Sequence, residues 1–314
     1  MVIANLSFLC NLPLYETEKP YFLKIIGNAE THTPTLLKTN LEFAPQKGIT
    51  IHDLQRRVPV DDAKGHGKTA DVADAALALD RFRLETHGFE FVQHTFANDP
   101  LAGDAAREAY CGDMVQLLKQ RCQAAYALCF DYRLRRSDHD LLVYETDPNA
   151  ERTVGAPPVF ACHIDHTVGG GPNRLRRHMT EAEAATYLCP KYRAYIINAW
   201  RPLKRAVEDC PIAICDPSSI DRHDLLATDR VTPDFAVEMY HLIYNPAQKW
   251  YWLPHQTPDE LLLFVNYDSH SEINGTQWLA CPHAAFMDAD AQENAQPRES
   301  IEVRVAIFTE VESA

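Results

Sequence analysis

His163 and Asp165 are separated by one residue and follow a strand-like run, Val159 to Cys162. In an extended strand, side chains two positions apart point to the same side, so this imidazole and this carboxylate can reach one point. Together they suit a divalent transition metal. On its own such a pair is more often a histidine that is hydrogen-bonded to a neighbouring acid, so the metal hypothesis depends on a third ligand.

His283 is the preferred third ligand. Two histidines and one carboxylate that leave coordination positions open form the arrangement used by non-haem iron(II). The interval between Asp165 and His283 is long, and it contains three other candidates: His241, His255 and His270. We prefer His283 because it precedes an arginine, Arg298, that is suited to hold an organic acid beside the metal.

Arg298 and Ser300 open a strand whose residues alternate in character. One face is apolar: Ile301, Val303, Val305 and Ile307. The opposite face is polar: Arg298, Ser300, Glu302 and Arg304. An arginine fork with a hydroxyl group two residues later is well shaped for a bidentate grip on a carboxylate. The order H-x-D, then His, then R-x-S is far more specific than any one of its parts.

Three residues of another strand, Asn198, Trp200 and Arg201, are further candidates. Asn198 and Trp200 share a face and are expected to line the site, with Asn198 either bonding to the bound organic acid or forming a turn at the strand end. Arg201 either binds a substrate carboxylate or pairs with an acid such as Asp216. Gly169 to Gly171 are expected to form a flexible lip of the pocket.

Composition and charge exclude several classes of function. The net charge of −14 would repel a nucleic acid unless a basic stripe overcame it. The two short basic clusters are expected to be solvated: Arg133, Arg135 and Arg136, and Arg174, Arg176 and Arg177. No apolar run is long enough to cross a bilayer. Nine scattered cysteines, without a CxxC pair or a signal peptide, favour reduced thiols and a cytoplasmic location.

Most of the expected elements are strands. β-Branched and aromatic runs predict them over Gly48–Leu54, Phe89–Thr95, Ala127–Tyr132, Val159–Asp165, Tyr192–Ala199, Leu261–Tyr267 and Ser300–Thr309. Apolar periodicity, a capping box at Thr180 and Glu183, and Pro233 predict helices over Arg107–Cys129, Thr180–Leu188 and Asp234–Tyr244. Residues 61–75 read as a polar loop.

These elements predict a mainly β fold with flanking helices, built on a jelly-roll, or double-stranded β-helix, core. We expect a single domain over residues 1–314. Residues 1–150 would pack on a core formed by residues 151–314, which carries the metal site and a long insert over residues 203–260.

The chain resembles iron(II)/2-oxoglutarate oxygenases of the gibberellin-desaturase and AsaB-like type, which include cephamycin-pathway components and an aziridine-forming amino-acid oxidase. The resemblance covers most of the chain, and short motifs carry it: Thr39-Asn40, His52-Asp53-Leu54-Gln55, His87-Gly88-Phe89-Glu90, His163-Ile164-Asp165, Asn198-Ala199-Trp200-Arg201-Pro202-Leu203, Cys215-Asp216, Lys249-Trp250-Tyr251-Trp252, Asp259-Glu260, Tyr267-Asp268-Ser269, Pro282-His283-Ala284-Ala285-Phe286 and Arg298-Glu299-Ser300-Ile301-Glu302-Val303-Arg304.

The resemblance implies that His163, Asp165 and His283 bind Fe(2+), and that Arg298 and Ser300 hold the distal carboxylate of 2-oxoglutarate. It also implies an O2-dependent oxidation of an unactivated C–H bond, with hydroxylation, desaturation or ring closure as the outcome. The expected partner is a small-molecule substrate of secondary metabolism, and we favour a branched aliphatic amino acid. The alternatives are a non-oxidative metal enzyme, such as a zinc hydrolase or isomerase, and a non-catalytic accessory protein.

Overall fold

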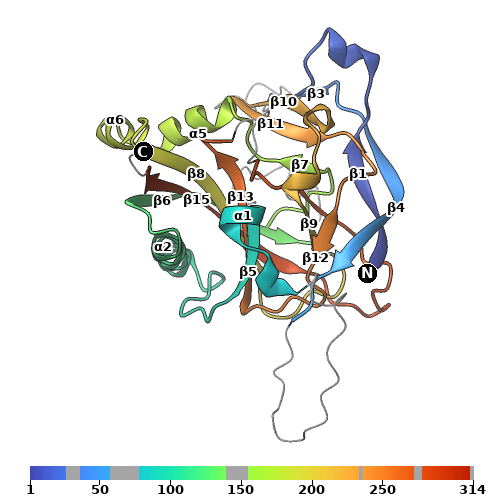
Figure 1. The fold of residues 1–314 in the computed structure, drawn as a ribbon. Helices are drawn as coiled ribbons and strands as arrows, with labels where there is room; N and C mark the ends of the chain where they lie inside the picture. Colours follow the sequence, from blue (N-terminus) through green and yellow to red (C-terminus); the bar gives the residue numbers. More distant parts are fainter. Residues whose placement is uncertain (26–35, 57–77, 139–154, 233–235, 272–277, 312–314) are drawn as a thin grey trace, which may run out of the picture.

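Two β-sheets lie face to face in the computed structural model of the protein (Figure 1). The structure describes residues 1–25, 36–56, 78–138, 155–232, 236–271 and 278–311. This mainly β arrangement with helices outside it is the predicted fold class, a jelly-roll core. No described helix is long and apolar enough to cross a membrane.

The larger sheet has ten strands in the described part of the chain, in the order β1-β4-β12-β9-β14-β7-β11-β10-β2-β3. Their bounds are β1 Val2–Leu9, β2 Tyr21–Ile25, β3 Leu36–Thr39, β4 Phe43–Asp53, β7 His163–Ile164, β9 Ile212–Cys215, β10 Leu225–Val231, β11 Ala236–Leu242, β12 Trp250–Trp252 and β14 His283–Ala285. Residues 203–260, expected as an insert, supply β9 to β12. They are therefore part of the sheet that carries both candidate histidines.

The smaller sheet has five strands in the described residues, in the order β5-β13-β8-β15-β6. Their bounds are β5 Phe89–Gln93, β6 Tyr126–Arg136, β8 Tyr192–Pro202, β13 Glu260–Asp268 and β15 Glu299–Glu310. Strand β15 pairs with β8 on one side and with β6 on the other, antiparallel in both cases. It is the strand that the alternation after Arg298 predicts.

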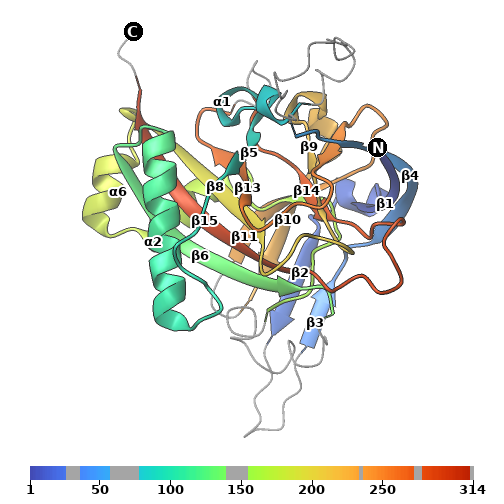
Figure 2. The ribbon, with the colours of Figure 1, turned by 90° about the horizontal axis from the view of Figure 1, so that it is seen from below.

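Four α-helices in the described residues flank the sheets: α1 Leu84–His87, α2 Asp104–Arg121, α5 Gly170–His178 and α6 Glu181–Tyr187. Short 3-10 helices are η1 Pro13–Glu16, η3 Leu79–Arg81, η4 Pro217–Ser219 and η5 Arg222–Asp224. Helix α2 lies across the outer face of β6 and β15 (Figure 2). Its buried residues Tyr110, Met114 and Leu118 pack against the apolar face of β15.

The polar face of β15 therefore points inward, between the two sheets. Two apolar clusters flank the polar residues of β15 in this space. One contains Trp200, Phe264 and Ile214, and the other contains Phe308, Tyr267 and Leu175. A polar inner face is unusual, because burying charged groups costs free energy unless they are paired. The centre of the space between the sheets is therefore the place to look for a functional site.

Most predicted elements are present, but four expectations differ. The strand predicted over Val159–Asp165 is reduced to the two residues of β7, His163–Ile164. The helix predicted over Arg107–Cys129 ends at Arg121, because the chain turns there and enters β6 at Tyr126. The helix predicted over Asp234–Tyr244 is strand β11 in its described part, since pairing with β10 and β7 outweighs local propensity. Gly169 to Gly171 lead into α5 instead of forming a flexible lip. The predicted helix over Thr180–Leu188 is α6, with its capping box formed. The 61–75 loop lies outside the described residues.

Candidate metal centre and its two cavities

His163, Asp165 and His283 come together between the sheets. One ligand atom of each lies within 4.8 Å of the others, although the third residue is far from the first two in sequence. Strand pairing brings the two histidines together, because His163 in β7 is the direct cross-strand partner of His283 in β14. The two imidazole ring centres are 4.3 Å apart, and Nε2 of His163 lies 3.5 Å from Oδ1 of Asp165.

Both histidines present the same nitrogen to the centre. Nδ1 of His163 lies 2.7 Å from the carbonyl oxygen of Ala161, and Nδ1 of His283 lies 3.2 Å from that of Cys281. A proton on each Nδ1 satisfies these carbonyl groups and leaves Nε2 with its lone pair. Burial lowers the pKa of His283 to about 3, and nearby His163 lowers it too, so this ring is neutral at physiological pH. A neutral imidazole is the form that binds a metal.

The two carboxylate oxygens of Asp165 have different surroundings. Oδ2 accepts hydrogen bonds from Nδ2 of Asn198 at 3.0 Å and from Nε of Arg304 at 2.9 Å. Oδ1 faces the histidines. Burial by itself raises the pKa of Asp165, but the charge of Arg304 and the hydrogen bond with His163 hold it well below its usual range. Asp165 is thus an anion with one oxygen held and one oxygen directed at the candidate centre.

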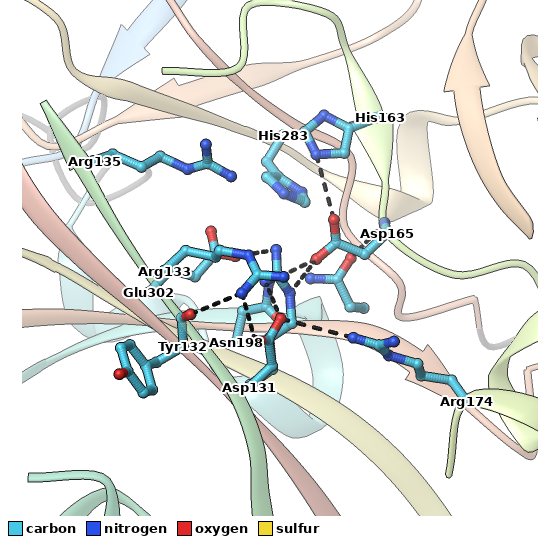
Figure 3. Close-up of polar contacts among 12 residues, drawn as sticks. Asp131, Tyr132, Arg133, Arg135, His163, Asp165, Arg174, Asn198, His283 and Glu302 are labelled. Atoms are coloured by element: carbon cyan, nitrogen blue, oxygen red, sulfur yellow. Dashed lines mark hydrogen bonds and ion pairs between the residues drawn. The ribbon is translucent and has the colours of Figure 1, made fainter. Parts of the chain in front are cut away.

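Arg304 links Asp165 to two further acids on the inner face of the smaller sheet, Asp131 and Glu302. All three acids are labelled in Figure 3. Nη1 of Arg304 lies 3.1 Å from Oδ2 of Asp131, and its Nη2 pairs with Glu302. Asp131 in turn meets Arg133 at 2.7 Å and Arg174 at 3.7 Å. The sequence reading of Arg133 and Arg174 as solvated surface residues is therefore wrong. They are mostly buried, because their strand and helix turn them inward toward acids.

A small inner cavity of about 30 Å³ adjoins the two histidines. Arg298, Trp200, Glu302 and Arg135 also line it, together with apolar residues of the larger sheet. Nη1 of Arg298 donates to the carbonyl oxygen of Cys210, whereas its Nε and the hydroxyl group of Ser300 have no partner among the described residues. Buried donors are seldom left unsatisfied in a native protein. Arg298 lines the cavity, and Ser300 lies between the lining residues Arg298 and Glu302 on the same strand face. The two unsatisfied donors fit a carboxylate that binds there.

A larger cavity of about 450 Å³, the outer cavity, also adjoins His163, and Asp165 lines it as well. Its apolar lining comes from Phe22, Leu41, Phe43, Val237 and Met239. Charged and polar residues line the rest: Asp131, Arg133, Arg135, His166, Arg174, Thr228, Arg230, His241 and Arg304. The candidate centre therefore lies where an inner cavity meets an outer one.

The other predicted residues have mixed outcomes. Asn198 lies beside the centre, but it contacts Asp165 directly, and its Oδ1 has no described partner. Trp200 lines the inner cavity, with Cζ of Arg298 5.5 Å from its ring. Arg201 corrects the expectation of a substrate contact. It faces outward from β8, where its Nε lies 2.9 Å from the hydroxyl group of Tyr110 and its guanidinium stacks on Phe96.

The rival histidines lie away from the centre. His241 lines the outer cavity with Nδ1 3.1 Å from the hydroxyl group of Thr228, and its ring centre is 6.5 Å from that of His163. His255 and His270 are exposed. Among the described residues, the group with ligand atoms close enough to share a metal is His163, Asp165 and His283.

The sequence reading did not single out Asp131, and it placed Arg304 on a polar strand face without a role. The expectation that Arg135 is solvated is wrong, because it is half-buried and lines both cavities. A signal was present, because Asp131, Arg133 and Arg135 alternate along a strand as the residues of the R-x-S strand do. In the structure these two rows are cross-strand neighbours, with Arg135 opposite Ser300 and Asp131 opposite Arg304. Charged residues on one strand find their partners on the next.

Comparisons with known proteins identify the family of this chain. Residues 31–308 match the family model described as an oxidoreductase/YMDC permease-like domain. The chain is 30% identical over 244 residues to the hydroxylase/desaturase efuI of Hormonema carpetanum, covering 73% of this chain and 79% of that protein. It is also 30% identical over 243 residues to the Fe(II)/2-oxoglutarate-dependent dioxygenase nvfI of Aspergillus novofumigatus, covering 75% and 81%.

A solved structure has the same fold. The iron and alpha-ketoglutarate-dependent endoperoxidase NvfI superposes with a TM-score of 0.73, covering 98% of each chain at 24% identity. The sequence relatives carry the family assignment, since each covers more than two thirds of both chains. This chain belongs to the Fe(II)/2-oxoglutarate-dependent dioxygenases, enzymes that use iron(II), 2-oxoglutarate and dioxygen.

Proposed function

We propose that His163, Asp165 and His283 bind iron(II), and that Arg298 and Ser300 hold the distal carboxylate of 2-oxoglutarate. The observation that carries the proposal is the inner cavity, which His163, His283 and Arg298 line together. A dicarboxylate bound to the metal at one end would place its distal carboxylate in this small cavity, beside the unsatisfied donors of Arg298 and Ser300. Family membership sets aside the hydrolase, isomerase and accessory-protein alternatives.

The donor set fits iron(II). Two neutral imidazole nitrogens and one carboxylate oxygen are the ligands of non-haem iron oxygenases, and they leave positions open for the cosubstrate. Asn198 and Arg304 occupy Oδ2 of Asp165, so one oxygen of this carboxylate is available to the metal. Such contacts around a ligand fix its orientation and usually change metal affinity when they are removed.

When bound, iron and 2-oxoglutarate would activate dioxygen for the oxidation of a C–H bond, with succinate and carbon dioxide as coproducts. The residues of this chain supply position and shelter. Arg298 and Ser300 orient the cosubstrate, while Val159, Ile212 and Ala285 exclude water from the inner cavity. Holding reacting groups in a productive geometry can contribute several kcal/mol to lowering a barrier, roughly 7–11 in the best cases.

The substrate of this proposal is a small molecule that enters the outer cavity, and a branched aliphatic amino acid remains our preference. Phe43, Val237 and Met239 offer an apolar wall for such a side chain, while the arginines of the same cavity suit a carboxylate. The oxidation would hydroxylate, desaturate or cyclise the substrate. Arg201 was expected to bind the substrate carboxylate, but it contacts Tyr110 instead. The arginines of the outer cavity would take that role.

Replacing each ligand tests the metal assignment. The variants His163→Ala, Asp165→Ala and His283→Ala should each weaken iron(II) binding on the order of 100-fold or more, above the loss expected for a neighbouring contact. Anaerobic titration with iron(II) measures this, and His270→Ala is the matched control because His270 is exposed. A His283→Ala protein that binds iron as the His270→Ala protein does would refute the assignment.

A further inference from the structure

The walls of the two cavities carry an excess of positive charge in an acidic protein. Six arginines line them: Arg133, Arg135, Arg174, Arg230, Arg298 and Arg304. Three carboxylates line them: Asp131, Asp165 and Glu302. The whole chain has a net charge of −14, so this excess is local. A positively charged cleft with low-dielectric walls attracts anions.

Most of these arginines already have partners. Arg304 pairs with Asp165, Asp131 and Glu302. Arg133 and Arg174 share Asp131. Arg298 is assigned above to the distal carboxylate of 2-oxoglutarate, and Arg230 lies on the exposed part of the wall.

Arg135 differs from them. Its hydrogen bond in the described part of the chain runs from Nη1 to the carbonyl oxygen of Pro157 at 2.9 Å, and no described carboxylate pairs with it. A buried or half-buried guanidinium group without an anion is costly.

The position of Arg135 suits a ligand that spans both cavities. It lines the inner cavity and the outer one, opposite Ser300 in the pairing of β6 with β15. Figure 3 shows its side chain extending toward His283 and His163. Burial lowers the pKa of Arg298, and the charge of Arg135 lowers it further, so the two guanidinium groups are close enough to repel each other.

We propose that Arg135 binds the carboxylate of the substrate and makes the enzyme selective for organic acids with an apolar body. The inference rests on the proposed function, in which the metal takes one end of 2-oxoglutarate and Arg298 takes the other. Both ends of the cosubstrate then have partners, and Arg135 remains as a half-buried cation that faces the outer cavity and has no carboxylate partner among the described residues. A bidentate pair with a carboxylate would compensate its charge, while Phe43 and Met239 contact the apolar body.

The test uses protein loaded with Mn²⁺ in place of iron and saturated with 2-oxoglutarate, so that no turnover occurs. The probes are 3-methylbutanoate and phenylacetate, each beside its neutral amide. Calorimetry measures their dissociation constants for the wild type, Arg135→Gln and Arg135→Lys. Arg136→Gln is the matched control, because Arg136 is the next residue of the same strand, faces the other way and pairs with Asp138 at 3.0 Å.

The wild type and Arg136→Gln should bind each acid more tightly than its amide. Arg135→Gln should lose roughly 10- to 100-fold in affinity for the acids and little for the amides, as expected for a charged hydrogen bond. Arg135→Lys should keep part of the preference, which shows that the charge and not the fold is responsible. A wild type without preference for the acids, or a preference that survives in Arg135→Gln, overturns the inference.

Binding of 2-oxoglutarate separates this inference from the proposed function. If Arg135→Gln weakens the binding of 2-oxoglutarate as much as Arg298→Lys does, Arg135 binds the cosubstrate. The assignment of Arg135 to the substrate is then wrong. If the Mn²⁺-loaded wild type fails to bind 2-oxoglutarate at all, the proposed function itself fails.

Discussion

Arg298 can be tested by a change that keeps its charge. Arg298→Lys replaces a planar fork by a point charge, which cannot make two parallel hydrogen bonds to one carboxylate. We expect the dissociation constant of 2-oxoglutarate to rise about tenfold or more, while binding of Mn²⁺ alone stays as in the wild type because Arg298 is not a ligand. Calorimetric titration of the Mn²⁺ form measures both. Unchanged 2-oxoglutarate affinity would remove Arg298 from the cosubstrate site.

For single residues, the sequence identifies candidate site residues by their type and order more readily than it identifies the residues that they pair with. The H-x-D pair, His283 and the R-x-S pair could be found because few other uses explain those types in that order. Arg304 could not be given a role, since its partners Asp131 and Asp165 come from distant segments. The expected substrate contact of Arg201 could have been rejected from the sequence, because strand alternation places Arg201 on the face opposite Asn198 and Trp200.

Among the elements, the C-terminal end of α1 packs at Gly88 against the segment that precedes His283. Gly88 ends α1 with a φ of +74°, and a Cβ there would lie 2.0 Å from the carbonyl oxygen of Leu279 and 2.8 Å from Sγ of Cys281. That segment leads directly into β14. We expect Gly88→Ala to lower the free energy of unfolding by about 2–4 kcal/mol and to weaken metal binding, because the strand that carries His283 must move.

Gly48→Ala is the matched control for this prediction. Gly48 has a φ of +75°, but a Cβ there would meet nothing within 4 Å. The control therefore isolates the backbone strain, which costs about 1–2 kcal/mol, from the steric contact. Chemical denaturation measures the free energy of unfolding of both variants, and iron(II) titration measures their metal affinity. Equal losses of stability with unchanged metal affinity would show that Gly88 is only a strained turn.

Elements with strong local signals could be predicted, and those set by tertiary pairing could not. Strand β15 and helix α6 follow from alternation and from a capping box. Strand β11 was read as a helix because its residues tolerate both states, and its partners β10 and β7 decide between them. Strand β14 has three residues, too few for any periodicity to appear.

At the scale of the whole molecule, the site joins the two sheets. The larger sheet supplies His163 and His283, while the smaller sheet supplies Ser300 and Arg304, with Arg298 directly before β15. The fold class could be predicted from the number of strands and their varied connections. The order of strands could not, because most neighbours in the larger sheet are far apart in sequence, as β14 and β7 are. Only that order brings the H-x-D pair to the distal histidine.

The most direct test of the account is the conversion of 2-oxoglutarate to succinate by the purified protein. Iron-loaded wild type is incubated with 2-oxoglutarate, with and without dioxygen, beside a panel of amino acids, terpenoid acids and aromatic acids. Succinate formation should require iron and dioxygen, rise with one chemical class of the panel, and disappear in Asp165→Ala but not in His270→Ala. Succinate formation that persists in Asp165→Ala, or its absence from iron-loaded wild type across the whole panel, would contradict the account.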